Sequence, residues 1–222
     1  MRVFQMQRLA IILFLYAVGG LEISIPSLPS ESWKAALVCR HIMHESDWIS
    51  IATLSTQNAI KGYPFVSLES MSDGPKTNST GVPYLYMTPL DTPSIDIMND
   101  DRVSIMASLA QSDYCKKENL DPEDPRCARV MISGTFKKIE KSFPEYDFAL
   151  MSLFERHPVM RKWPKGHAFY PAKIDIQQIQ LFDNFGGVKQ VTPKEYFDVN
   201  ITNILNMNLN FDKIFIVDVT TV

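Results

Sequence analysis

The sequence contains none of the short motifs that mark the commonest enzyme classes. Gly-x-Ser-x-Gly, Gly-x-x-x-x-Gly-Lys and His-Glu-x-x-His are all absent, so no nucleophile elbow, phosphate-binding loop or zinc-protease helix is predicted. His41 and His44 are three residues apart, but the nearest acids, Glu45 and Asp47, follow the last helical turn. Cys39 and His41 would point away from each other on a helix. We therefore predict no catalytic residue and no metal ligand.

The chain also lacks an excess of positive charge. It has 22 Lys and Arg against 25 Asp and Glu, and residues 1–20 hold two of the Arg and no acid. The remainder therefore has 20 basic and 25 acidic residues, a net charge of −5. Because nucleic-acid binding needs a concentrated positive surface, we predict no direct contact with nucleic acid.

No segment is long and apolar enough to cross a membrane, since a spanning helix needs about 20 apolar residues. The N-terminal apolar run, Leu9–Val18, has ten residues and follows a basic start that ends at Arg8. Small residues, ending at Gly20, come next. This order is typical of a secretory signal peptide. We predict that residues 1–20 are removed and that the protein is secreted without a membrane span.

Secretion makes disulfides and glycans possible. Cys115 and Cys127 flank one polar loop and are the best of the three possible pairs; two free thiols remain the alternative. Such a disulfide would stabilise the fold by roughly 3 kcal/mol. Cys39 lies on an apolar helical stripe and is predicted to be a buried free thiol. Asn78 and Asn200 each begin an Asn-x-Ser/Thr sequence without proline, so both are predicted glycosylation sites.

Two segments in the middle of the chain alternate between apolar and polar residues with a period of two. Residues 102–109 and 128–137 therefore predict two strands, each with one face toward the core. The polar connection 113–127 contains Pro122 and Pro125 in Asp-Pro steps. Because proline restricts itself and the residue before it, we predict no helix in this loop.

Apolar periodicity predicts helices over residues 32–45 and 143–156. Ser142 and Glu145 have the spacing of a capping box for the second helix. A short helix should begin after Thr192, with proline at its first position. His41 and His44 lie off the apolar stripe of the first helix, which favours the surface for both.

The remaining alternating segments bring the number of predicted strands to about six. A change of parity in the last strand predicts a β-bulge near Gln177–Gln178. Many short strands with long connections favour a closed barrel, so the predicted fold class is mainly β with flanking helices (α+β). The predicted order is a signal peptide, an extended linker, a single barrel domain and a tail of undefined structure. Their bounds are 1–20, 21–31, 32–202 and 203–222.

Over roughly residues 33–202 the sequence resembles the CREG family, the cellular repressors of adenoviral-oncoprotein-stimulated genes. The phrases that carry the resemblance, in chain order, are His44–Trp48, Ala52–Thr56, Ser72–Pro75, Gly81–Tyr84, Cys115–Lys117, Ser133–Thr135, Arg156–Pro158, Phe185–Gly187 and Val191–Tyr196. The resemblance implies a split β-barrel related to the FMN-binding pyridoxamine-phosphate oxidases, working as a homodimer. It further implies a secreted, endosomal and lysosomal glycoprotein in growth control, differentiation or lysosomal homeostasis. A cell-surface or lysosomal sorting receptor would be its partner.

The resemblance also implies that flavin is not used. In flavin-binding relatives, the segment corresponding to Thr88–Ile95 usually supplies a basic residue for the FMN phosphate. Here it contains no Lys or Arg, and Asp91 would repel a phosphate. We therefore expect no cofactor and no enzymatic activity, with an FMN-dependent oxidoreductase as the alternative. Residues 116–126 are then expected to form an exposed recognition or dimer-flanking loop.

Overall fold

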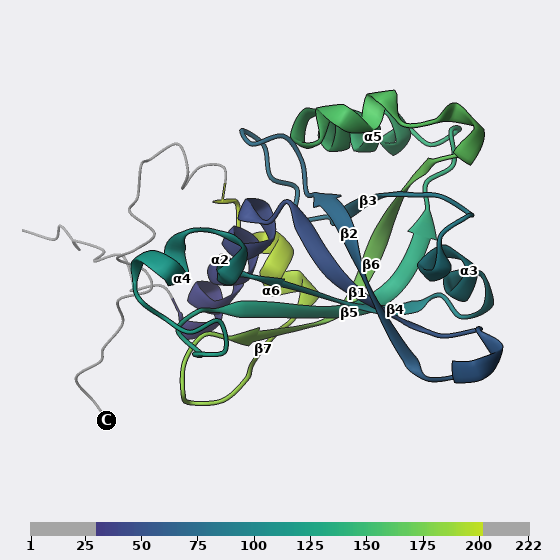
Figure 1. The fold of residues 1–222 in the computed structure, drawn as a ribbon. Helices are drawn as coiled ribbons and strands as arrows, with labels where there is room; N and C mark the ends of the chain where they lie inside the picture. Colours follow the sequence, from purple (N-terminus) through teal and green to yellow (C-terminus); the bar gives the residue numbers. More distant parts are fainter. Residues whose placement is uncertain (1–29, 202–222) are drawn as a thin grey trace, which may run out of the picture.

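The computed structural model describes residues 30–201, which form a closed antiparallel barrel with helices at its ends and side (Figure 1). Its strands run in the order β3-β2-β1-β4-β5-β6-β7, and a further β3–β6 pairing closes the first six into a ring. The predicted fold, a split barrel with flanking helices in a single domain, is confirmed. The strands are β1 Trp48–Leu54, β2 Pro64–Ser72, β3 Tyr84–Met87, β4 Arg102–Ser108, β5 Arg129–Lys138, β6 Tyr170–Phe182 and β7 Lys189–Val191.

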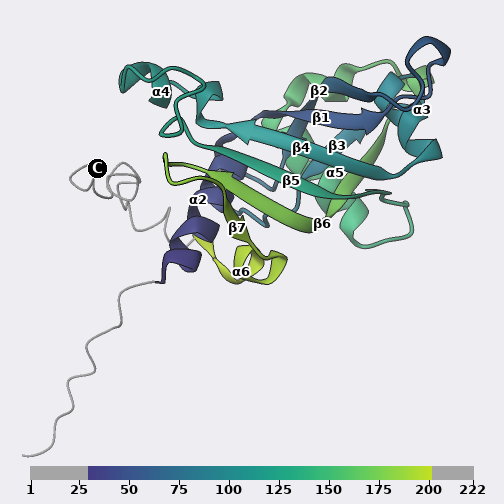
Figure 2. The same ribbon diagram turned by 90° about the horizontal axis from the view of Figure 1, so that it is seen from below.

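The helices cover the barrel from three sides. α5 forms a layer over one side, α3 lies at one end, and α2 and α6 lie together at the other end (Figures 1 and 2). Four short 3-10 segments, η1 to η4, complete the connections. The helical segments are α2 Glu31–Glu45, η1 Asn58–Ile60, α3 Thr92–Asn99, η2 Leu109–Gln111, α4 Tyr114–Lys117, α5 Glu145–Arg156, η3 Pro158–Lys162, η4 Lys165–His167 and α6 Pro193–Asp198.

Strand β6 pairs with β5 and also with two further strands. Its first part, from Tyr170, pairs with β3 and closes the barrel, while its later part pairs with β7. Along β5 the register shifts so that Ser133 faces Gln178 and Gly134 faces Ile176. The extra residue, Gln177, confirms the predicted bulge. A Cβ on Gly134 would lie 2.2 Å from the carbonyl oxygen of Asp175, so this close approach requires glycine.

Helix α2 closes one end of the barrel as a buried plug. Ser30 caps its first turn by accepting a hydrogen bond from the Trp33 amide. The helix therefore begins at Glu31, inside the segment predicted as a linker. Residues on nearly every side of it are buried, including Cys39, which has a free thiol as predicted. Burial raises the pKa of this thiol beyond the range in which it could ionise.

The loop between β4 and β5 is stapled as predicted, by a Cys115–Cys127 disulfide with Cα atoms 5.4 Å apart. The prediction that it contains no helix is wrong, because α4 forms one turn at Tyr114–Lys117. This turn ends well before Pro122, and a proline restricts only its own position and the one before it. Figure 2 shows α4 projecting away from the barrel.

The predicted capping box of α5 is also wrong. Pro144 occupies the N-cap position, and no side chain caps the helix. Glu145 instead accepts hydrogen bonds from Tyr84 Oη at 2.9 Å and Lys173 Nζ at 2.7 Å. These contacts with strands β3 and β6 replace the predicted capping contact with Ser142. The short helix predicted after Thr192 is α6, and Thr192 caps it in a capping box with Glu195.

The predicted signal peptide and the 203–222 tail lie outside the described residues, as does most of the predicted linker. Between residues 30 and 201, no helix has the length and apolar character needed to cross a membrane.

Candidate functional site

Two regions bring charged side chains together below the surface. The first is a junction where the end of α2, the 72–81 loop and the end of α5 meet. His44 Nδ1 lies 2.7 Å from Asp73 Oδ1, and its Nε2 lies 3.1 Å from the carbonyl oxygen of Lys76. Because a carbonyl only accepts, Nε2 donates to it and Nδ1 faces the carboxylate. Ser79 Oγ donates to the second carboxylate oxygen at 2.5 Å. The surface position predicted for His44 is wrong: it is 1% exposed.

Arg156 joins α5 to this junction. Its guanidinium donates to the carbonyl oxygens of His44 at 2.8 Å and Ser46 at 3.0 Å, and it pairs with Asp47 at 2.9 Å. The last carbonyls of a helix have no partner within the helix. Arg156 supplies that partner at the end of α2 and thereby fixes the position of α5.

Arg40 joins the same loop to helix α6. It is 2% exposed and donates to the carbonyl oxygens of Tyr196 and Val199, and to both the carbonyl and the hydroxyl of Ser79. Gly81 packs directly on it, since a Cβ there would lie 2.7 Å from Arg40 Nε. The guanidinium is held by fixed acceptors on the 72–81 loop and at the end of α6.

This junction is a structural element. Five of the phrases that resemble the CREG family contribute to it: His44–Trp48, Ser72–Pro75, Gly81–Tyr84, Arg156–Pro158 and Val191–Tyr196. Its ionisable side chains all have partners, and the one buried polar side-chain atom that the described residues leave there without a hydrogen bond, Arg40 Nε, is covered by Gly81. It therefore has the properties of a buried network that specifies a packing arrangement.

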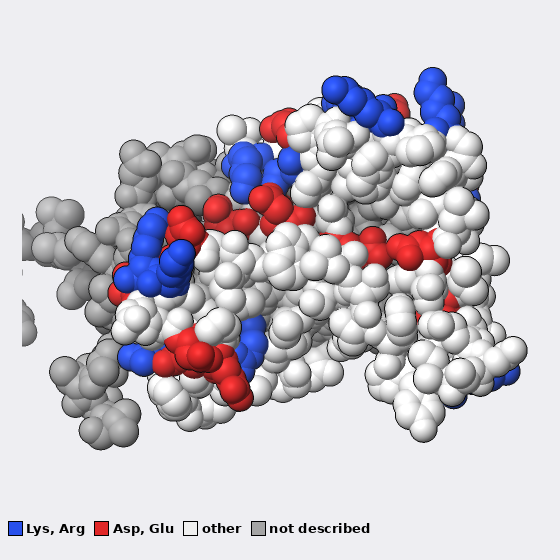
Figure 3. Space-filling view, viewed as in Figure 1, with Lys and Arg blue, Asp and Glu red and all other residues white. Residues whose placement is uncertain are grey.

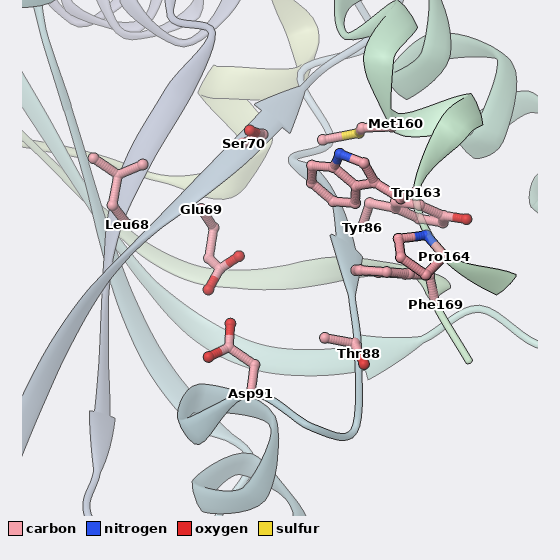
Figure 4. Close-up of a pocket in the computed structure, with 10 residues that line it drawn as sticks. All are labelled: Leu68, Glu69, Ser70, Tyr86, Thr88, Asp91, Met160, Trp163, Pro164 and Phe169. Carbon is pink, nitrogen blue, oxygen red and sulfur yellow. The ribbon is translucent and has the colours of Figure 1, made fainter. Parts of the chain in front are cut away.

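The second region is a cleft of about 400 Å³ between β2 and β3. These strands pair only where Met71–Ser72 faces Tyr84–Leu85. Beyond that point they diverge, and the cleft opens between them. Figure 4 shows its lining: Leu68, Glu69, Ser70, Tyr86, Thr88, Asp91, Met160, Trp163, Pro164 and Phe169.

The two walls of the cleft differ in chemistry. On one side, the rings of Tyr86, Trp163 and Phe169 form a triangle with centroids 4.9 to 6.0 Å apart. On the other side, the carboxyl groups of Glu69 and Asp91 point toward each other (Figure 4). Figure 3 shows acidic side chains along the hollow beneath the α5 layer. The lining contains two acids and no Lys or Arg.

Glu69 is the least satisfied acid in the cleft. Its Oε1 atom is buried and has no hydrogen-bond partner. Burial, followed by the charge of Asp91 and a hydrogen bond to it, raises the pKa of Glu69 to about 8. Asp91 also caps α3 by accepting from the Thr92 amide at 2.9 Å.

Sequence reasoning found Asp91 but missed Glu69. The signal was present, because Glu69 shares the inward parity of Phe65 and Met71 on β2. An acid at an inward strand position indicates either a buried partner or a site.

The cleft does not fit the phosphate of a flavin mononucleotide. Thr88 and Asp91 bring the segment expected to meet that phosphate to the cleft lining, and Glu69 adds a second acid. A dianionic phosphate needs charge-assisted donors. Two carboxyl groups in their place would oppose it.

The predicted modification sites lie at the surface. Asn78 is exposed on the loop whose Ser79 and Thr80 are anchored to Asp73. Asn200 is exposed just after α6. Both positions leave room for a glycan. Between residues 30 and 201, no three His, Cys, Asp or Glu side chains gather closely enough to hold a metal ion.

Solved structures share this architecture at low sequence identity. A heme binding protein from Mycobacterium smegmatis superposes with a TM-score of 0.59 and 16% identity, over 77% of this chain and 62% of that one. The chain thus spans about three fifths of the mycobacterial protein. A protein of the pyridoxinephosphate oxidase family from Clostridium acetobutylicum has a TM-score of 0.50 and 10% identity, over 74% and 98%. The fold is therefore that of the split β-barrels.

Comparison of the sequence with known proteins identifies the family within this fold class. A family model described as CREG, beta-barrel matches residues 30–198. Protein CREG1 of Mus musculus is 42% identical over 177 residues, which are 80% of this chain and 79% of that protein. Protein CREG1 of Gallus gallus is 38% identical over 193 residues, or 86% and 99%. The chain belongs to the CREG family, as the resemblance in the sequence indicated.

Proposed function

We propose that this protein is a secreted glycoprotein that reaches endosomes and lysosomes and acts without catalysis, through protein partners. Its role would lie in growth control, differentiation or lysosomal homeostasis. In this proposal the barrel serves as a rigid scaffold that assembles as a homodimer. The main observation behind the proposal is an outer face of the sheet that has no ionisable side chain at its centre.

That face is built by β2, β1, β4 and β5. Two rows of outward residues cross these strands in register. Neither row contains an ionisable side chain, although Val66 and Leu68 are 63% and 58% exposed. A second copy of the chain is the occupant best suited to such a face, because depletion of charge at the centre is typical of protein interfaces. The rows are Leu68, Ser50, Met106, Met131 and Val66, Ala52, Ser104, Ser133.

A charge introduced into this face tests the dimer. Ser104 is exposed in the middle of one row, so Ser104→Arg should leave the barrel folded and convert the dimer to a monomer. Sedimentation equilibrium of the secreted protein measures the mass. Ser142→Arg, at an exposed loop position away from the face, is the matched control and should remain dimeric. A monomeric unmodified protein at micromolar concentration would refute the dimer.

Two features that are typical of proteins in the secretory pathway support the proposed secretion: a disulfide and exposed, predicted glycosylation sites. A disulfide is favoured in oxidising surroundings, and Asn78 and Asn200 are both exposed. Asn78→Gln and Asn200→Gln should each remove one glycan from the protein secreted by cultured cells, as read by mass before and after glycosidase treatment. Retention of the protein inside cells without any glycan would contradict secretion.

Exposed acids on the loop closed by the Cys115–Cys127 disulfide favour the proposal that this loop binds a receptor. Glu118, Asp121 and Glu123 are exposed on it, whereas Asp124 is paired with Arg126 and holds the loop in shape. Glu118→Ala with Glu123→Ala should leave secretion intact and weaken capture of a cell-surface or lysosomal sorting receptor. Asp124 should be left in place, because its loss would disturb the loop itself. Unchanged capture would give the loop a purely structural role.

An FMN-dependent oxidoreductase is the second candidate, favoured by the fold alone. Titration with FMN separates the two proposals. Binding tighter than about 1 μM, or roughly −8 kcal/mol, would favour the flavoenzyme. The two acids in the cleft lead us to expect weaker binding.

A further inference from the structure

We propose that the cleft between β2 and β3 binds a small organic cation, an amine or guanidine on a flat apolar body. The body would pack against the rings of Tyr86, Trp163 and Phe169. The cationic group would lie between Glu69 and Asp91. This site opens beside the sheet face through which the protein is proposed to dimerise, and Leu68 borders both.

The aromatic wall is ordered by contacts that do not depend on a ligand. Phe154, from α5, packs edge-on against Tyr86, with centroids 5.3 Å apart. Tyr86 and Phe169 stack at 5.0 Å with 18° between their planes. Met160 is buried behind them. A preformed aromatic surface binds an apolar body at little conformational cost, and its rings also attract a cation.

The acidic wall is only partly satisfied, through the hydrogen bond between Glu69 and Asp91. Glu69 Oε1 is buried without a hydrogen bond, and the facing carboxyl group of Asp91 has the same charge when both are ionised. A ligand with several N–H donors would satisfy this oxygen and replace the repulsion between the acids by two attractions.

Other ligand classes fit less well. A metal ion usually takes more protein ligands than two carboxylates, and no third His, Cys, Asp or Glu joins these among residues 30–201. An anion would meet two acids. Arg161 and Lys165 line an adjoining cleft, which shares the aromatic wall of Tyr86, Trp163 and Phe169 with this one. The Arg161 guanidinium lies over the Phe154 ring. The volume of about 400 Å³ is in the range of small-molecule sites.

Three probes with the same body and different charge test the site. Full-length protein is titrated at about pH 8.5, where Glu69 is largely ionised, with 2-phenylethylamine, 2-phenylethanol and phenylacetate. Binding is followed by calorimetry and by tryptophan fluorescence. The amine should bind saturably and at least about tenfold more tightly than the alcohol, because hydrogen bonds to charged groups are the stronger ones. Phenylacetate should bind more weakly than the alcohol.

Variants of the cleft assign the binding. Glu69→Gln and Asp91→Asn should each weaken the amine about tenfold, and Asn at position 91 can still cap α3. Glu155→Gln, an exposed acid on α5, is the control and should bind as the unmodified protein does. Trp163→Phe should bind the amine but lose the fluorescence change. No saturable binding of the amine, equal binding of phenylacetate, or full affinity in both acid variants would overturn the proposal.

Discussion

The junction at His44 and the cleft at Glu69 both bury carboxyl groups, and they treat them in opposite ways. In the junction, each oxygen of Asp73 meets its own donor, from His44 and Ser79. In the cleft, Glu69 has one buried oxygen with no partner and faces another acid. Both regions therefore bury a carboxyl group. They differ in how many hydrogen-bond donors the protein supplies to it.

The comparison distinguishes an acid that holds the fold from one that is available for binding. Removing a matched buried charge leaves its partner alone in a low-dielectric interior, which is costly. Removing a buried charge that has no partner, such as that of Glu69, relieves its repulsion with the neighbouring acid. The same substitution chemistry should thus lower stability in the junction and raise it in the cleft.

The largest effect is expected for Asp73→Ala. Loss of this carboxylate leaves His44 and Ser79 without their buried acceptor, so the free energy of unfolding should fall by roughly 3 to 5 kcal/mol. Urea unfolding followed by fluorescence measures it. Asp47→Ala is the control and should cost less than about 1 kcal/mol. The Asp47 side chain is 60% exposed, and the buried Arg156 keeps its hydrogen bonds to the carbonyl oxygens of His44 and Ser46. Equal losses would remove the distinction.

The junction loop should also be intolerant of a methyl group at Gly74. Its φ is +133°, and a Cβ would lie 2.2 Å from the carbonyl oxygen of Asn78. Gly74→Ala should therefore lower the free energy of unfolding by about 2 to 3 kcal/mol. Gly62 has a φ of +79° but open space around it, so Gly62→Ala should cost only about 1 kcal/mol. If the two variants match in denaturation, backbone strain alone governs both positions.

The smallest effect, and one of opposite sign, is expected for Glu69→Gln. Folding raises the pKa of Glu69 from 4.5 to about 8, so its ionisation disfavours the folded state. That penalty is absent below the unfolded value and complete above the folded one. The variant should match the unmodified protein near pH 4 and be more stable near pH 9, by roughly 1 to 2 kcal/mol after solvent screening. Thermal unfolding across this range measures it, and a variant that is less stable near pH 9 would contradict the assignment.

The barrel could be predicted from sequence because its signals are local. The alternation of apolar and polar residues over 102–109 and 128–137 predicted two strands. The change in the parity of the apolar positions near Gln177 predicted the bulge. The disulfide followed from two cysteines that flank one loop. Thr192 capped α6 as its spacing indicated.

What was missed depends on contacts between distant segments. His44 lies off the apolar stripe of its helix, and only the 72–81 loop, folded against it, makes its burial favourable. Glu145 had the spacing of a capping residue, yet Tyr84 and Lys173 bind it instead. The cleft is formed by three segments, and its rings at Tyr86 and Trp163 meet only in the folded chain.

The plug helix α2 also sets the order in which the protein can fold during synthesis. It is made first, yet Arg40 finds its acceptors at Tyr196 and Val199, more than 150 residues later. Until α6 leaves the ribosome, α2 can contact strands such as β4, β5, β6 and β7, but the Arg40 guanidinium lacks these acceptors. Contacts of such long sequence separation slow folding and prolong aggregation-prone intermediates. We therefore expect the described domain to complete its folding only after α6 has emerged.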